Sequence, residues 1–381
     1  METCCLGGTN IPKSPKYSQR RSPVWQRLPI AWNDLEAKRT LRLNFCRPDQ
    51  AERSSGRSAN CRNYFQYHAQ CVPKSIDMAV NPQHFVHFLE RIGHTIREAN
   101  GLYWCNTQRG VYSSFPFHRD VDATKVDLGS VLKRDGLIAR FGCPVEQGVE
   151  SFRIICDNPN YDFPLLRSRT RTQVRRGLEA CRVAQVDFSL LQQHAIPLNA
   201  DTLVRQGRKV PSNLTSYWTR YYLEAAQTEG AEAWAAFVGN SLAAYLISFT
   251  IEDVANLLIV RSSLQFLDAF PNNALLYRFV YDRMRSGDVK QISYGYESIQ
   301  AGLGSLDQFK TGMGFRQAPA GQRIELAGWV RPLVNRFTMP LAKRVLKQFG
   351  EGETTAKLNG ILEWYQAQPA LSGKPVQLRA A

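Results

Sequence analysis

The clearest alternation of apolar and polar positions lies in the carboxy-terminal half of the chain. Two apolar runs flank the turn Gly239-Asn240-Ser241 and predict a β-hairpin, and a third run rich in Leu, Ile and Val predicts the next strand. A helix is predicted from Pro271, where apolar residues begin to share one helical face, to Gly287. The expected order is three strands, helix, strand, helix, strand, at residues 234–238, 242–249, 255–261, 271–287, 289–296, 305–314 and 322–326.

The preceding part of the chain predicts helices and strands from shorter patterns. Asn81-Pro82 is typical of a helix start, and apolar residues from Phe85 to Ile96 then recur at the spacing of one helical face. Strands are expected on both sides of a turn at 106–110. A further strand at 152–156, a helix at 165–181 and a short strand at 183–188 complete this part.

Both ends of the chain differ from this pattern. Residues 1–77 lack sustained periodicity and are predicted to be a disordered basic segment. Because Met78 directly precedes the first amphipathic pattern, we hypothesise that the functional chain begins there. Residues 331–381 predict helices with an apolar side and many basic residues elsewhere. Such helices either lie on anionic membranes or cover a core while their charges face water, and the sequence leaves both open.

Composition excludes several classes of protein. No apolar run approaches the roughly 18 to 20 residues that a membrane-spanning helix needs. The first residues do not resemble a secretory signal, so the expected compartment is the cytoplasm. The nine cysteines form no Cys-x-x-Cys pair and the six histidines show no His-x-x-x-His spacing, so no metal site is expected. All nine cysteines lie between Cys4 and Cys181, which disfavours a thiol nucleophile in the later half.

The net charge of +15 is concentrated near the start of the chain, where residues 1–75 hold about half of it. A basic chain attracts RNA, anionic lipid or phosphorylated substrates, and the same charge also serves solubility alone. A second concentration is the run of arginines from Arg167 to Arg176, which includes Arg169 and Arg175. These two side chains are candidates for binding phosphates, and the alternative is a solvated helix face.

Four stretches, in this order and spacing, resemble the GNAT superfamily of acyltransferases, and within it the FemABX-like branch. They are the arginine-rich helix 166–178, the hairpin 237–246, the helix start at 271–276 and the segment Phe309-Lys310-Thr311-Gly312-Met313-Gly314-Phe315. The resemblance covers residues 81–329. It implies an α/β (α+β) fold with a GNAT-like mixed sheet flanked by helices. It also implies two GNAT-like halves, a degenerate one at 78–228 and a catalytic one at 229–330.

The resemblance implies a gap in the sheet for the acyl donor. In that family two parallel neighbouring strands part, and the matching strands here are residues 255–261 and 289–296. Arg261, Ser262 and Phe309 are the expected substrate-binding residues beside the gap. The lysine of the Phe-Lys motif, Lys310, would stabilise the oxyanion of the tetrahedral intermediate. The alternative is a solvated lysine on the surface of a helix.

Side chains near this gap supply the remaining candidates. Tyr294 and Tyr296 are expected on one face of their strand because side chains alternate, and one phenol would relay a proton. Glu297, directly after the strand, is the nearest candidate base. Asn272 and Asn273 either offer amides to an anion or cap the helix.

The donor stays open between acyl-CoA and aminoacyl-tRNA. Residues 263–273 contain no glycine, whereas acetyltransferases of the family wrap a pyrophosphate with a glycine-containing loop. FemABX-like members use aminoacyl-tRNA. We interpret the chain as an N-acyltransferase that acts directly on an amine of a cell-envelope, polysaccharide or amino-acid-derived acceptor. The alternative is a non-catalytic basic protein that binds RNA or a membrane surface.

Overall fold

The computed structural model describes residues 79–133, 135–297, 304–334, 338, 344 and 353–371, without the side chains of residues 304–306 and 353–357. The segment 1–77 with its predicted disorder, and most of 331–381, lie outside the described residues. Within those residues, no helix combines the length and the apolar content that crossing a bilayer requires.

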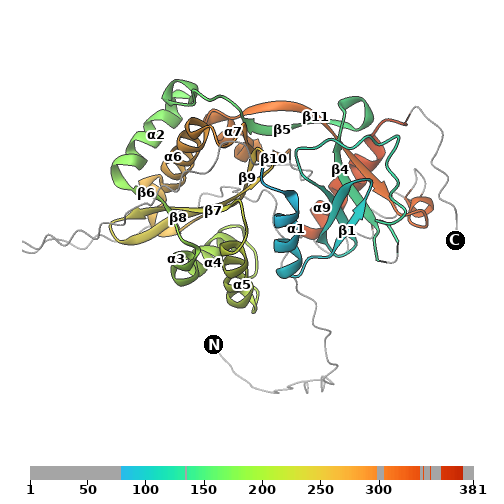
Figure 1. Ribbon diagram of the computed structural model, residues 1–381, viewed down its shortest axis with the longest axis horizontal. Helices are drawn as coiled ribbons and strands as arrows, with labels where there is room; N and C mark the ends of the chain where they lie inside the picture. Colours follow the sequence, from blue (N-terminus) through green and yellow to red (C-terminus); the bar gives the residue numbers. More distant parts are fainter. Residues whose placement is uncertain are drawn as a thin grey trace, which may run out of the picture.

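One mixed sheet of eleven strands runs through the described part of the chain (Figure 1). Neighbouring strands are antiparallel, except that β3 is parallel to β4 and β9 is parallel to β10. From one edge to the other the order is β1 (Ile96–Ala99), β2 (Leu102–Gln108), β3 (Val111–Phe115), β4 (Ile138–Cys143), β11 (Arg316–Leu326), β5 (Val149–Cys156), β10 (Gln291–Tyr296), β9 (Val254–Ser262), β8 (Ser241–Ile251), β7 (Ala231–Val238) and β6 (Arg182–Val186).

Helices cover both faces of the sheet around β7 to β10, which explains the nearly continuous apolar sequences of these strands. Along β7, Trp234 and Ala236 belong to one core and Ala233 and Ala235 to the other, because side chains alternate. The first core lies against α2 (Ser168–Ala180), α6 (Pro271–Ser286) and α7 (Gly304–Gly312). The second lies against α1 (Pro82–Arg91), α3 (Phe188–His194), α4 (Ile196–Arg205) and α5 (Leu214–Ala226) (Figure 1).

The predicted order of elements in the carboxy-terminal half is confirmed from β7 to β11. In the amino-terminal half the predicted first helix is too long. It ends at Arg91, because Gly93 at φ 100° redirects the chain, and Ile96 begins β1 instead. The sequence patterns also missed β4 and the three helices α3, α4 and α5.

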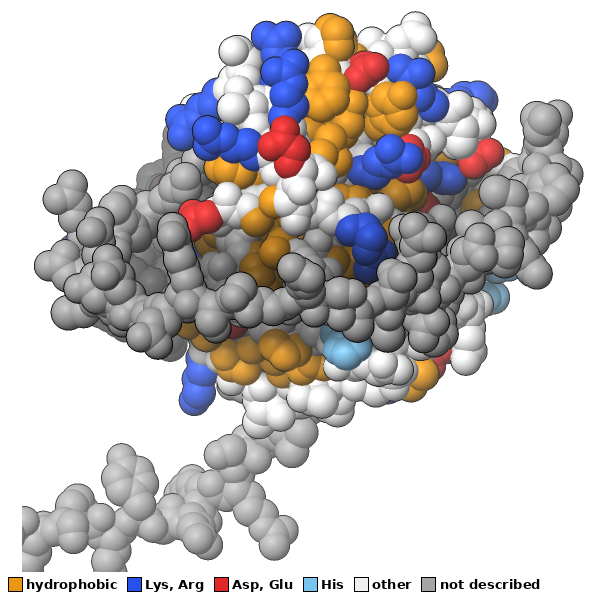
Figure 2. All heavy atoms as spheres, turned by 90° about the vertical axis from the view of Figure 1, so that its left-hand side faces the viewer, with side chains coloured by type: hydrophobic (Ala, Val, Ile, Leu, Met, Phe, Trp, Pro, Cys, Tyr) orange, Lys and Arg blue, Asp and Glu red, His pale blue; other side chains and the backbone are white. Residues whose placement is uncertain are grey.

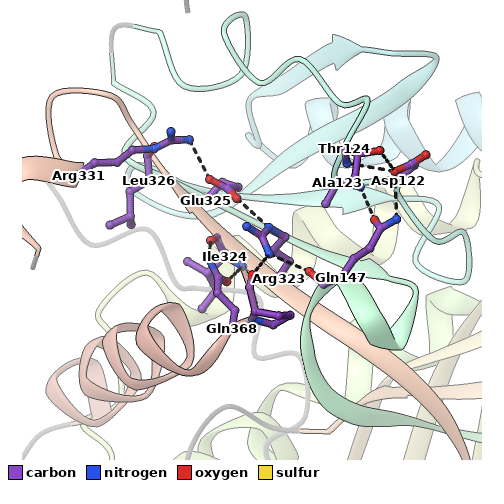
Figure 3. Close-up of polar contacts among 11 residues, drawn as sticks. Asp122, Ala123, Thr124, Gln147, Arg323, Ile324, Glu325, Leu326, Arg331 and Gln368 are labelled. Carbon is purple, nitrogen blue, oxygen red and sulfur yellow. Dashed lines mark hydrogen bonds and ion pairs between the residues drawn. The ribbon is translucent and has the colours of Figure 1, made fainter. Parts of the chain in front are cut away.

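A helix that the tail pattern predicts, α9 (Glu353–Ala367), is anchored to β11 by the residues that follow it (Figure 3). The amide of Gln368 donates to the carbonyl of Ile324 at 2.9 Å and accepts from its N–H at 3.0 Å, as a neighbouring strand would. The buried Arg323 donates to the carbonyl of Pro369 at 3.0 Å. The chain after α9 therefore serves as a partner for one end of β11.

We expect Gln368→Ala to lower the free energy of unfolding by about 1–3 kcal/mol, because it leaves two main-chain groups of the buried Ile324 without partners. Urea unfolding measures the loss. Gln193→Ala on α3 is the control, since Gln193 is exposed and the change should have almost no effect. Equal losses in the two variants would contradict the anchoring role.

Candidate active site

The two parallel strands β9 and β10 pair over three residues and then part. Gln291 lies opposite Val254, and the last pair is Ser293 with Asn256. No further pair joins the two strands in the described residues, although β9 continues to Ser262. Beyond Asn256, β9 has therefore lost its neighbour on this side. The predicted separation of the two strands is confirmed.

A β-bulge in β10 turns its two tyrosines to opposite faces of the sheet. The register to β5 shifts after Ser293, and Gly295 takes φ 92°, which favours glycine. Tyr294 packs on Phe315 in the first core, which lies against α2, α6 and α7. Tyr296 instead lies opposite Arg153 of β5. The prediction that both phenols share one face is wrong, because the extra residue breaks the alternation.

Lys310 is buried beneath β10 on the Tyr294 face. Its side chain is 1% exposed, and its Nζ lies 4.8 Å from the centre of the Tyr294 ring and 3.5 Å from Oδ1 of Asp307. Burial lowers the pKa of Lys310 to about 8, and the charge of Asp307 opposes that shift. A solvated helix lysine is therefore excluded. The neighbouring Phe309 is half-buried against the same core.

The hydroxyl of Tyr294 is buried and has no hydrogen-bond partner within the described residues. Burial raises the pKa of Tyr294 well above its usual value, whereas the charge of Arg261 lowers it. Arg261 belongs to β9 and Tyr294 to β10. The two strands therefore bring a cation close enough to the phenol to act on its charge, near the point where the strands separate. Arg261 also donates to the carbonyl of Val260 at 3.0 Å.

Glu297 directly follows β10, and its carboxylate is held by a hydrogen bond from β5. Its N–H donates to the carbonyl of Phe152 at 2.9 Å, and Oε2 accepts from the Ser151 hydroxyl at 3.0 Å. Burial raises the pKa of Glu297, the Ser151 bond lowers it, and the charge of Asp307 raises it further. Gln322 of β11 donates to the Ser151 oxygen at 2.7 Å and so leaves the serine proton for the carboxylate. The Glu297 carboxylate is held half-buried and becomes protonated more readily than usual.

The end of β9 meets the beginning of α6. The amide nitrogen of Asn272 donates to the hydroxyl of Ser262 at 3.0 Å, and its Oδ1 is buried without a partner in the described residues. Asn273 is buried and its Nδ2 lies 3.5 Å from Oε1 of Gln173. The N-cap residue of α6 is Phe270, which makes no side-chain capping bond. Capping is therefore excluded as the role of either asparagine.

Arg169 and Arg175 are exposed side chains of α2. Arg175 stacks over Phe163, with 5.4 Å between the guanidinium carbon and the ring centre. Lys and Arg side chains gather on the upper part of this side of the molecule (Figure 2). The start of α2 contacts the end of α7, where the N–H of Arg167 donates to the carbonyl of Gly312 at 3.0 Å. Anion binding by Arg169 and Arg175 stays a prediction.

Sequence reasoning missed the polar residues that β4, β5 and β11 contribute, among them Arg140, Ser151 and Gln322. Arg140 donates through Nε to Oε1 of Gln322 at 3.1 Å. Burial lowers the pKa of Arg140 to about 10, so it remains a cation near neutral pH. One signal was available, because a charged residue inside an otherwise apolar strand, as in Ile138-Ala139-Arg140-Phe141, is unusual in a core.

Across the part of the chain that the structure describes, no group of three or more His, Cys, Asp or Glu side chains is arranged to hold a metal ion. The four cysteines among these residues are buried free thiols, at Cys105, Cys143, Cys156 and Cys181. Burial raises the pKa of each, to about 12 for Cys105 and about 11 for Cys156. They are unreactive as nucleophiles, since the thiolate is the reactive form.

No family model and no curated protein matches the sequence. Solved structures resemble it in outline. A crystal structure of FemX is 12% identical, covers 69% of this chain and 93% of its own, and has a TM-score of 0.46. The structure of L-PGS from Bacillus licheniformis is 12% identical, with 72% and 99% covered and a TM-score of 0.42. A tandem GNAT protein from the clavulanic acid biosynthesis pathway is 11% identical, with 60% and 78% covered and a TM-score of 0.36.

The described residues form a mixed α/β fold with a large mixed sheet flanked by helices, which is the fold class expected from the sequence. Three antiparallel strands, β7 to β9, lead into α6 and then into β10, which begins parallel to β9 and parts from it. One sheet joins all the strands from β1 to β11 of the described residues, and the division into halves at 78–228 and 229–330 stays a prediction.

Proposed function

We propose that the protein is an N-acyltransferase that moves an acyl or aminoacyl group from an activated donor to an amine. The supporting observation is the separation of β9 and β10 after Ser293. Around it lie a buried lysine, a half-buried carboxylate and a phenol that has no hydrogen-bond partner among the described residues. In the reaction an amide C–N bond forms and the C–S or C–O bond of the donor breaks. The amine proton passes to the protein, and the leaving thiolate or alkoxide takes up a proton.

Glu297 is the proposed acceptor of the amine proton. Its raised pKa lies nearer neutrality than that of a solvated glutamate, which suits a general base. Tyr294 is the proposed donor to the oxyanion, because its buried O–H lacks a partner in the described residues and stays protonated. Lys310 adds a positive charge below the Tyr294 ring, where little water screens it.

The donor binds with its carbonyl in the gap and its anionic end towards the start of α6. Backbone N–H groups at a helix start attract phosphates, and Ser262 and Asn272 lie at that point. Both acyl-CoA and aminoacyl-tRNA meet these requirements. The acceptor is an amine of a cell-envelope, polysaccharide or amino-acid-derived molecule, and the cytoplasm is the proposed compartment.

Native mass spectrometry of the full chain with acetyl-CoA or aminoacyl-tRNA tests the proposal. We expect one of the two donors to be retained at one molecule per chain, and to lose its acyl group faster when amines are added. Retention of neither donor, with no loss of the acyl group, would reject the transferase. If uncharged tRNA binds as well as the charged form and only at low salt, the RNA-binding alternative is favoured instead.

A further inference from the structure

Two arginines on one face of the central strands are held against oxygens that carry no formal charge. Arg140 of β4 donates to Oε1 of Gln322 and, through Nη2, to the main-chain carbonyl of Glu297 at 3.4 Å. Arg153 of β5 donates through Nη1 to the main-chain carbonyl of His118. Both side chains are half-buried. Burial therefore removes part of the water around each guanidinium group, and no carboxylate in the described residues forms an ion pair with either of them.

Tyr296 lies on the same face of the sheet as the two arginines and near both of them. It is opposite Arg153 in the register of β10 and β5. A Cβ added at Gly142, two residues after Arg140 on the same face of β4, would lie 1.8 Å from the Tyr296 hydroxyl oxygen. The charges of Arg153 and Arg140 both lower the pKa of Tyr296, against the larger effect of burial, which raises it.

The nearby acidic groups form no ion pair with Arg140 or Arg153 in the described residues, and the Glu297 carboxylate accepts from the Ser151 hydroxyl instead. Glu252 binds His118, with 2.7 Å between Nε2 and Oε2, and also pairs with Arg119. Asp120 is exposed, and no ion pair in the described residues joins any carboxylate to Arg140 or Arg153. Nε of Arg153 is buried without an acceptor there. Because a withdrawn charge without a counter-charge is unfavourable, the arrangement favours an anionic ligand.

We propose that Arg140 and Arg153 bind a carboxylate or phosphate of the amine acceptor. The proposal rests on the proposed function, since it makes the acceptor an anionic amine rather than a neutral or polycationic one. Guanidinium groups match the oxygens of carboxylates and phosphates in pairs. Arg140 touches the main chain of Glu297, so an anion held by the arginines places an amine a few atoms away beside the candidate base.

Thermal unfolding of the full chain, without donor or acceptor, tests the anion site. Inorganic phosphate and acetate are titrated separately at constant ionic strength, with chloride as the reference. We expect Tm to rise with the logarithm of the concentration of one anion above its Kd, by about 3 °C at ten times the Kd. A rise with phosphate indicates a phosphorylated acceptor, and a rise with acetate indicates a carboxylate. A rise no larger than that with chloride would overturn the site.

Three variants locate the binding. Arg153→Gln should weaken the anion at least tenfold, whereas Arg176→Gln, on the exposed side of α2, should leave its Kd unchanged. Asp120→Asn removes an exposed negative charge that acts on Tyr296, so it should tighten binding several-fold without disturbing the fold, even if Arg153→Gln does not fold. An unchanged Kd in Asp120→Asn, or full binding in Arg153→Gln, would contradict the proposal. These readouts need no acyl transfer, so they are separate from the test of the transferase.

Discussion

Lys310→Met is expected to lower kcat by a factor on the order of 10² to 10³ while the chain stays folded. The lysine is 1% exposed and its charge lies under Tyr294, so the variant removes a charge that acts where the oxyanion develops. Methionine has a similar length and no charge, whereas alanine would leave a cavity in the core. Steady-state kinetics with the identified donor measure the effect. Lys125→Met is the control, since Lys125 is exposed.

The same variant has a signature in stability that does not depend on activity. The pKa of Lys310 is about 8 in the folded chain and about 10.5 when the lysine is solvated, so between these values the unfolded chain binds more protons. Lys310 should therefore contribute a rise in stability with pH across this interval, on the order of 3 kcal/mol, which is measured as the difference between wild type and Lys310→Met. A wild-type kcat that stays constant as the pH passes well above 8 would contradict a role for the lysine cation.

Glu297→Gln is the second change with a large expected effect, a loss of about 10² to 10⁴ in kcat/KM. The amide keeps the size of the side chain but cannot accept the amine proton. Wild-type activity should rise with pH as Glu297 loses its proton, at a pKa above the usual 4.5 for this group. The pH profile of kcat/KM measures this acid limb. Glu179→Gln on the exposed side of α2 is the control.

A second variant, Ser151→Ala, tests the direction in which the pKa of Glu297 moves. The Ser151 hydroxyl donates to the Glu297 carboxylate at 3.0 Å and stabilises its charged form, so its loss should move the acid limb to higher pH. If Glu297 had only a structural role, its replacement would lower activity without changing the pH profile. An acid limb that stays in place in Ser151→Ala would therefore exclude Glu297 as the group that titrates.

The sequence predicted the carboxy-terminal half well because each element there carries its own local pattern. The turn Gly239-Asn240 marks a hairpin, and α6 has an apolar face that ends at Gly287. The parting of β9 and β10 also followed from the resemblance. By contrast, β4 pairs with β11, about 180 residues later in the chain, and no local pattern reports such a partner.

The site itself was predictable in part. Lys310, Tyr294 and Glu297 are brought to the end of β10, whereas anion binding by Arg169 and Arg175 stays a prediction. The face of Tyr296 was mispredicted because one glycine at positive φ inserts a residue into the alternation, and sequence alone does not show which glycine forms a bulge. Ser151 and Gln322 were missed because they meet only through the pairing of β5 with β11, which brings together residues far apart in the sequence.

The position of β5 between β10 and β11 limits how the molecule can be divided. Residues 229–330 contain β7 to β11, but the strand that joins β10 to β11 comes from residues 149–156, earlier in the chain. A fragment cut at residue 229 would leave both of those strands with open edges, and it would also lack the serine beside Glu297. Residues 149–156 are therefore a structural component of the candidate site, and residues 229–330 alone would not contain that site.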